Sequence, residues 1–201
     1  MKKRILGAAL LLMLPLALRA QEIPKAELSV GYSLLRYSTL GFLDLKTTNH
    51  GWNVSIAPNI NSNLALVFDF AGHYGTFDEN VSAFEQLKFE FQDHSVMAGP
   101  RVSETVAGRW KPFAQLLVGY HRLNVDVTDQ FLSFAPDFDA DTSSGVSLTL
   151  GGGLDLIASE RIALRLFQLE YAVQHLKDLG DRIEGARIGA GIVFRLGSKS
   201  Q

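Results

Sequence analysis

Acidic and basic side chains recur on one side of apolar, strand-like segments of this chain. Such a set could pair as ions, line a gated or narrow pore, or supply an acid and a base for catalysis. Charges in a narrow interior are poorly hydrated, so each needs a partner of opposite sign. We therefore predict an interior charge network. Its members are Glu27, Asp69, Arg101, Asp155, Arg165, Glu170, Arg187 and Arg195.

Catalysis and metal binding find little support in the residue pattern. A nucleophilic hydrolase needs a nucleophile and a base held together. His73 and His94 have Ser82 and Ser95 in their neighbourhood, but no serine, histidine and acid are spaced as a triad. The five histidines are scattered, with none at metal-ligand spacing. We predict that the protein is not an enzyme and holds no cofactor or metal.

The segment over residues 186–196 indicates how the charges are positioned. Side chains of a strand alternate between two faces. One face is apolar throughout and consists of Ile188, Ala190, Ile192, Phe194 and Leu196. The other face carries Arg187 and Arg195. A soluble, calycin-like ligand-binding barrel would turn the apolar face inward, whereas a membrane barrel would turn it toward lipid.

Seven further segments read as strands. They cover residues 26–37, 50–59, 64–74, 91–102, 110–123, 146–157 and 161–176. The last of them breaks step, because Leu164 and Leu166 share their parity with Gln168 and Glu170. One extra residue near 166–167, a β-bulge, would restore the alternation and place Arg165 on the same face as Gln168 and Glu170.

The connections between these segments alternate in length. Those near 37–50, 76–90, 124–145 and 177–185 are long and polar, whereas those at 60–63, 103–109 and 158–160 are short and rich in turn-forming residues. This layout is typical of an antiparallel barrel that crosses a bilayer. The segments match the roughly 9–11 residues that a tilted strand needs to cross hydrocarbon. We predict an all-β fold, an eight-stranded antiparallel up-and-down transmembrane β-barrel, whose interior side chains can fill.

Aromatic side chains are expected to form girdles at the two membrane–water interfaces, where an amphipathic ring meets lipid headgroups. The predicted girdle residues are Trp52, Tyr74, Trp110, Tyr120, Tyr171 and Phe194. The alternative is that they are core aromatics of a soluble barrel.

The first twenty residues read as a cleaved secretory signal. Lys2, Lys3 and Arg4 form a positive head, an apolar run follows, and Ala20 precedes the expected cleavage site. The apolar run is shorter than the roughly 20 residues that span a membrane. We predict that residues 21–201 form one exported barrel domain. The formal charge of -2 and the pI of about 6.2 give no support to nucleic-acid binding.

Several runs taken together resemble the OmpA-like outer-membrane β-barrel family. They are Leu-Ser-Val-Gly-Tyr-Ser (28–33), Gly-Trp-Asn-Val-Ser (51–55), Asp-Phe-Ala-Gly-His-Tyr-Gly (69–75), Ala-Gly-Pro-Arg (98–101), Gly-Gly-Gly-Leu-Asp (151–155), Arg-Ile-Ala-Leu-Arg-Leu-Phe-Gln-Leu-Glu-Tyr (161–171) and Gly-Ala-Gly-Ile-Val-Phe-Arg (189–195). The resemblance covers nearly all of residues 21–201 and implies an eight-stranded barrel in the outer membrane of a Gram-negative bacterium. The peptidoglycan-binding domain of larger relatives is not expected.

The resemblance also implies that the barrel-assembly machinery recognises the last strand, which usually ends in an aromatic residue. Here Phe194 is followed by Arg195 and Leu196. Leu196 would then occupy the aromatic position.

We expect a structural role in the envelope or a role in surface-loop interaction, in contact with outer-membrane lipid. The long connection over 124–145 is acidic and aromatic, so it could bind calcium or an extracellular partner. The alternatives are a small porin that passes ions or small solutes, and the soluble ligand binder named above.

Overall fold

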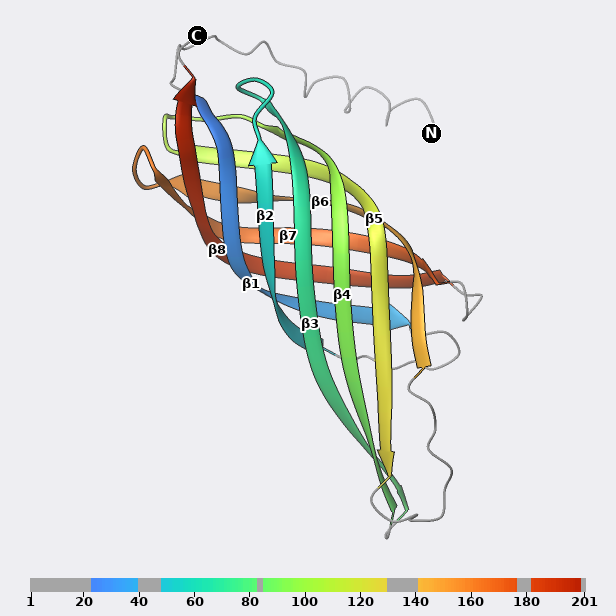
Figure 1. The fold of residues 1–201 in the computed structure, drawn as a ribbon. Helices are drawn as coiled ribbons and strands as arrows, with labels where there is room; N and C mark the ends of the chain where they lie inside the picture. Colours follow the sequence, from blue (N-terminus) through green and yellow to red (C-terminus); the bar gives the residue numbers. More distant parts are fainter. Residues whose placement is uncertain (1–22, 40–47, 83–84, 130–140, 177–181, 200–201) are drawn as a thin grey trace, which may run out of the picture.

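The protein is built from eight β-strands (Figure 1). The computed structural model describes residues 23–39, 48–82, 85–129, 141–176 and 182–199. The strands are β1 (Ile23–Thr39), β2 (Thr48–Pro58), β3 (Leu64–Ser82), β4 (Glu85–Ser103), β5 (Trp110–Asp129), β6 (Asp141–Ile157), β7 (Ile162–Leu176) and β8 (Arg182–Lys199). Residues 1–20 lie outside the described ranges, so the signal segment stays a prediction.

Each strand pairs antiparallel with its sequence neighbours, and β1 also pairs with β8, which closes the barrel. Closure leaves no sheet edge along the body of the barrel, so the backbone hydrogen bonds there are made between strands. The prediction of an eight-stranded antiparallel up-and-down barrel is confirmed. Within the described ranges, no helix is both long and apolar enough to cross a membrane.

The apolar face of the strands points outward. On β8, Ile192 and Phe194 are 43% and 39% exposed, whereas Arg187 is only 5% exposed. The same alternation runs around the barrel, which leaves an apolar belt of valine, leucine, isoleucine and phenylalanine on the outside. A patch of that size on a soluble protein would drive aggregation. The soluble, calycin-like alternative is therefore wrong.

The bulge predicted in β7 is confirmed. Arg165 pairs with Gly191 and Gln168 pairs with Gly189, so β7 has one residue more than β8 over this stretch. Leu166 and Phe167 both point outward, and the inward parity resumes at Gln168. The bulge thus keeps Arg165 and Glu170 inside and Leu166, Phe167 and Leu169 outside.

The two ends of the barrel differ. At one end, called the turn end below, short turns join β2 to β3, β4 to β5 and β6 to β7, as predicted. The side chain of Asn61 accepts hydrogen bonds from the backbone N–H groups of Asn63 and Leu64 at 2.9 and 2.8 Å. The side chain of Ser159 accepts one from the N–H of Ile162 at 3.1 Å. Such local bonds satisfy backbone groups that the sheet leaves free.

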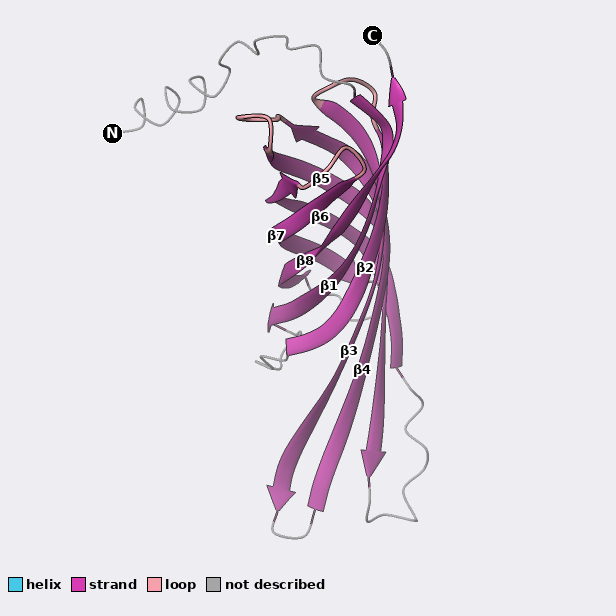
Figure 2. Cartoon of the chain, turned by 90° about the vertical axis from the view of Figure 1, so that its left-hand side faces the viewer, coloured by secondary structure: helices cyan, strands magenta, loops and turns pink. Residues whose placement is uncertain are grey.

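At the opposite end, called the extended end, β3, β4 and β5 project well beyond the other strands (Figures 1 and 2). Strands β3 and β4 stay paired from Gly75 and Phe91 out to Ser82 and Glu85, and β5 continues to Asp129. The sequence pattern predicted a long polar connection over 76–90. That prediction is wrong in this respect, because β3 and β4 continue their antiparallel pairing through this stretch, which contains no proline, and the register shift between Asn80 and Ser82 does not end the pairing.

Candidate functional site

The barrel interior is occupied by polar and charged side chains from every part of the wall. Seven of the eight predicted charge-network residues lie there with 5% or less of their surface exposed. They are Glu27, Asp69, Arg101, Asp155, Arg165, Glu170 and Arg187. An ionised group so deeply buried is stable only when paired and hydrogen-bonded.

The central layer is built on Arg187 of β8. Its Nε donates to Glu170 Oε2 at 2.5 Å, and its Nη2 donates to Asp69 Oδ1 at 2.8 Å. The second oxygen of Glu170 accepts from the amide of Gln115 at 2.6 Å. One guanidinium therefore bridges two carboxylates that approach from β3 and β7.

A second layer lies toward the turn end and is built on Arg165 of β7. Its Nε and Nη2 donate to the two carboxylate oxygens of Asp155 at 2.8 and 3.0 Å, a bidentate pair. Its Nη1 donates to Gln168 Oε1 at 2.8 Å. Across the barrel, Lys111 Nζ donates to Glu27 Oε1 at 2.5 Å.

Two of the arginines lie over the same aromatic ring. The guanidinium carbons of Arg101 and Arg165 lie 4.7 and 4.5 Å from the centroid of the Phe113 ring. Arg101 Nε also donates to Gln115 Oε1 at 2.8 Å. Because the face of the ring is electron-rich, it lets two cations approach each other in a poorly hydrated interior.

We expect Phe113→Leu to lower the free energy of unfolding by about 0.5–2 kcal/mol more than Phe91→Leu, because only the first variant removes cation–π contacts. Phe91 is a matched control, since it is also buried and inward-facing but no arginine lies over its ring within the described residues. Urea unfolding in lipid vesicles measures both losses. Equal losses would mean that the ring acts only by filling space.

Arg195 does not join the network, which corrects its predicted placement. Its Nη1 donates to the backbone carbonyls of Ser159 and Glu160 at 3.4 and 3.3 Å. Arg195 has the inward parity, but it lies at the turn end, where the β6–β7 turn carbonyls are the acceptors within reach. The alternation along β8 predicts that the Arg195 side chain faces inward, but it does not predict how far along the barrel axis the side chain lies.

Sequence reasoning missed Lys111 as a member of the network. Extending the alternation of β5 from Gln115 back by four residues would have found it, since both side chains point inward. Asp93 was missed for the same reason, because it lies two residues before the inward-facing Ser95.

A third polar layer lies toward the extended end. The Nδ1 of His121 is 3.2 Å from Asp93 Oδ1, and the hydroxyl of Tyr37 donates to the other oxygen of Asp93. His73 Nε2 is hydrogen-bonded to the hydroxyl of Ser33 at 2.8 Å. Tyr37 also belongs to a cluster of buried apolar side chains at this end, together with Leu35, Leu123 and Ile183.

Two small cavities lie in the described part of the interior. A cavity of about 20 Å³ lies between His73, Asp93 and Arg187, and another of about 10 Å³ lies beside Ser29 and Arg165. A single water molecule needs roughly 10–15 Å³ of such volume. These cavities can hold isolated waters but no substrate.

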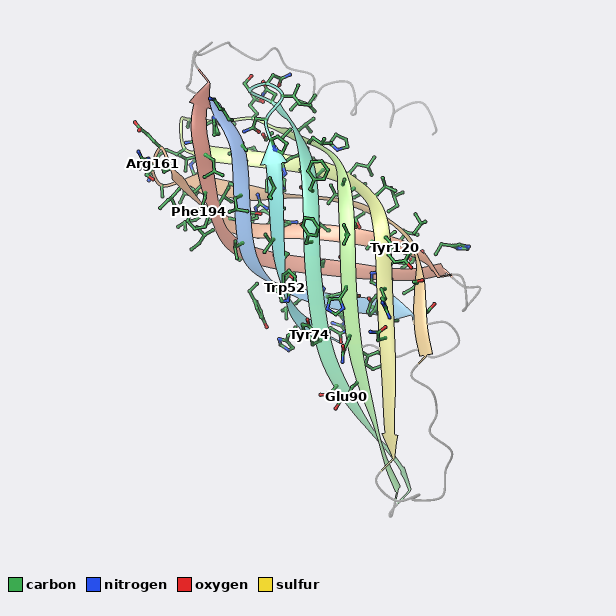
Figure 3. All side chains as sticks on the ribbon, in the orientation of Figure 1. Trp52, Tyr74, Glu90, Tyr120, Arg161 and Phe194 are labelled. Carbon is green, nitrogen blue, oxygen red and sulfur yellow. The ribbon has the colours of Figure 1, made fainter. Side chains whose placement is uncertain are left out.

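All six predicted girdle residues point away from the axis and are exposed on the outside of the barrel. Figure 3 shows Trp52, Tyr74 and Tyr120 toward the extended end and Phe194 toward the turn end. Two of the rings have fixed orientations: the hydroxyl of Tyr74 is hydrogen-bonded to His94 Nε2 at 3.1 Å, and the hydroxyl of Tyr171 donates to Glu184.

A family model described as "Outer membrane protein beta-barrel domain" matches residues 6–195 of the chain. The chain belongs to this family. The resemblance to OmpA-like barrels is confirmed. The predicted location in the outer membrane is confirmed as well. In barrels of this kind, short turns face the periplasm and long connections face the exterior, so the extended end is the extracellular one.

Solved structures share the fold of the outer-membrane barrel. Neisserial surface protein A is 12% identical, with a TM-score of 0.64 over 86% of this chain and 97% of that one. Ail of Yersinia pestis is 21% identical, with a TM-score of 0.54 over 86% and 99% of the two chains. OprG of Pseudomonas aeruginosa is 8% identical, with a TM-score of 0.56 over 89% and 98%. No curated protein sequence matches significantly.

Proposed function

We propose that this outer-membrane barrel is a closed structural element of the envelope that carries extracellular strands, and that it neither conducts solutes nor catalyses a reaction. The observation that carries the proposal is the filled interior. Three polar layers cross the lumen, most of their charges are held in ion pairs, and the two cavities found between them among the described residues are about 20 and 10 Å³. Eight strands enclose just enough space for side chains.

The pairing of the interior charges also argues against catalysis. A general acid or base must reach the proton that it transfers. The carboxylates of Asp69, Asp155 and Glu170 are instead held by arginines, with 2% or less of each residue exposed. A substrate would have to break these ion pairs to reach any of them.

We expect the purified protein to give no steady open-channel steps in planar lipid bilayers at either polarity, because the polar layers leave no continuous aqueous path. A general porin inserted under the same conditions is the positive control, and heat-modifiable migration on a denaturing gel verifies that the barrel is folded. Reproducible unit steps from the folded protein would contradict the proposal and favour a porin.

A small porin is the second candidate, and one observation favours it. Several buried polar atoms near the extracellular end have no hydrogen-bond partner among the described residues, including both side-chain polar atoms of Asn49, His73 Nδ1 and Gln174 Oε1. Buried polar groups of this kind are normally satisfied by water. A hydrated outer half of the lumen would be one part of a conducting path, and the Arg187 layer would then be its gate.

We further propose that the projecting strands β3, β4 and β5 present a surface to an extracellular partner. Their length beyond the barrel supports this, because nothing in the membrane requires strands to continue that far. Ail, which shares the fold, has been crystallised in complex with the heparin analogue sucrose octasulfate. Residues 130–140 of the acidic and aromatic connection lie outside the described ranges.

Recognition of the last strand by the barrel-assembly machinery also remains a proposal. Strand β8 closes the barrel against β1, and Phe194 and Leu196 both point outward from it. These two outward-facing apolar side chains at the periplasmic end of β8 support the proposal that the assembly machinery recognises this strand.

A further inference from the structure

An open groove lies on the outer surface near the extracellular end. Its volume is about 430 Å³, and its polar lining comes from the end of β2 and from β3 and β4. The lining residues that carry the argument are Thr48, His50, Tyr74, Thr76, Glu90 and Gln92. The volume falls within the range of about 300–1,000 Å³ that is typical of ligand sites.

The groove arises from the strand lengths. Strands β2 and β3 are paired up to His50 and Tyr74, whereas β3 and β4 remain paired well beyond that point. The last pair of the β2–β3 ladder therefore forms the floor of the groove. Thr76 and Glu90, which face each other on β3 and β4, form the part of the groove that lies farther out along the projecting strands. Figure 3 shows Trp52, Tyr74 and Glu90 in this order toward the extended end.

The aromatic floor is held in place before any ligand arrives. The hydroxyl of Tyr74 is bound to His94, and the two rings meet edge to face with centroids 5.6 Å apart. His50 is in turn hydrogen-bonded to the hydroxyl of Tyr32. With 45% of its surface exposed, Tyr74 offers a ring that is fixed in orientation and open to a ligand.

The lining chemistry fits a sugar better than a phosphate. It combines an aromatic ring with two hydroxyls, an imidazole, an amide and one carboxylate, and no lysine or arginine is among the described lining residues. An aromatic face can contact the C–H groups of a pyranose, and the amide and carboxylate can bind its hydroxyls. On the adjoining strand, Arg36 is exposed and pairs with Thr48 in the β1–β2 ladder. It is placed to meet an anionic substituent at the margin.

The position of the groove identifies the source of the sugar. Trp52 lies two residues from His50 toward the apolar belt, and tryptophan and tyrosine mark the headgroup level of a bilayer. The groove thus opens sideways where the headgroups of the outer leaflet lie. We propose that it binds a sugar ring of the headgroup of an outer-leaflet glycolipid, with Tyr74 as the stacking platform and Gln92 and Glu90 as hydroxyl ligands.

The test compares wild type, Tyr74→Ala and Tyr171→Ala in phosphatidylethanolamine nanodiscs with increasing fractions of lipopolysaccharide. Tyr171 is a matched control, because it is equally exposed and also hydrogen-bonded but lies on β7. Hydrogen exchange of the backbone around residues 48–52 and 74–76 measures occupancy. Saturable protection is expected in wild type and in Tyr171→Ala, whereas Tyr74→Ala should need roughly tenfold more glycolipid.

A second variant, Gln92→Ala, keeps the ring and should also weaken binding, which guards against an effect of Tyr74 on folding. Three outcomes would overturn the proposal. One is the absence of saturable protection in wild type. Another is an equal loss in Tyr171→Ala, which would indicate general anchoring by aromatic rings. The third is protection by the deacylated oligosaccharide in solution with none from the reconstituted glycolipid.

Discussion

Replacing Arg187 with methionine is expected to lower the free energy of unfolding by about 3–5 kcal/mol, the largest loss of any single change in the lumen. The guanidinium lies between the carboxylates of Asp69 and Glu170 at 2.8 and 2.5 Å. Methionine fills a similar volume but leaves two buried carboxylates facing each other without a cation. Urea unfolding in lipid vesicles, followed by tryptophan fluorescence, measures the change.

Two further variants make the Arg187 measurement specific. Arg195→Met removes a guanidinium that binds only turn carbonyls among the described residues, so it is expected to cost far less. Combining Asp69→Asn and Glu170→Gln with Arg187→Met removes the stranded charges and should recover most of the stability. If Arg187→Met costs no more than Arg195→Met, the central ion pairs do not hold the barrel together.

Introducing arginine at Leu150 is expected to cost about 2–4 kcal/mol, because the side chain would enter the hydrocarbon near the middle of the bilayer. Leu150 is 62% exposed on the lipid-facing side of β6. In water the same surface position would tolerate a charge. The size of the loss therefore reports directly on which face of the strand meets lipid.

Ser144→Arg is the control for Leu150→Arg, because Ser144 shares the strand and the outward parity but lies nearer the extracellular interface. Its expected cost is about 0–1 kcal/mol, since the penalty falls with distance from the bilayer midplane. Unfolding in vesicles again gives both values. Equal costs at the two depths would contradict the proposed placement of the apolar belt in the membrane.

The number of strands, the alternation of their two faces and the bulge of β7 can all be predicted from the sequence alone. These features are local. A period of two assigns a face to every residue, and the step between Arg165 and Gln168 can be read without knowing any other strand. The direction of the faces was predicted from the connections, whose alternating lengths are typical of an antiparallel barrel that crosses a bilayer.

Which charges meet cannot be predicted without the three-dimensional fold. Lys111 and Glu27 are separated by 84 positions in the chain, and Arg187 and Asp69 by 118. Their contacts depend on the stagger between strands and on depth along the barrel axis. Arg195 is a further example. Its inward-facing parity was predicted correctly, but its partners are turn carbonyls because it lies at the turn end of the barrel axis.

The extracellular end was likewise decided by pairing between strands. Whether residues 76–90 form a loop or a ribbon depends on the hydrogen bonds that β3 and β4 make with each other and with β5, and composition alone does not encode them. The groove over Tyr74 exists only because β2 stops pairing where its neighbours continue. Relative strand length is a property of the closed sheet, so no single segment reveals it.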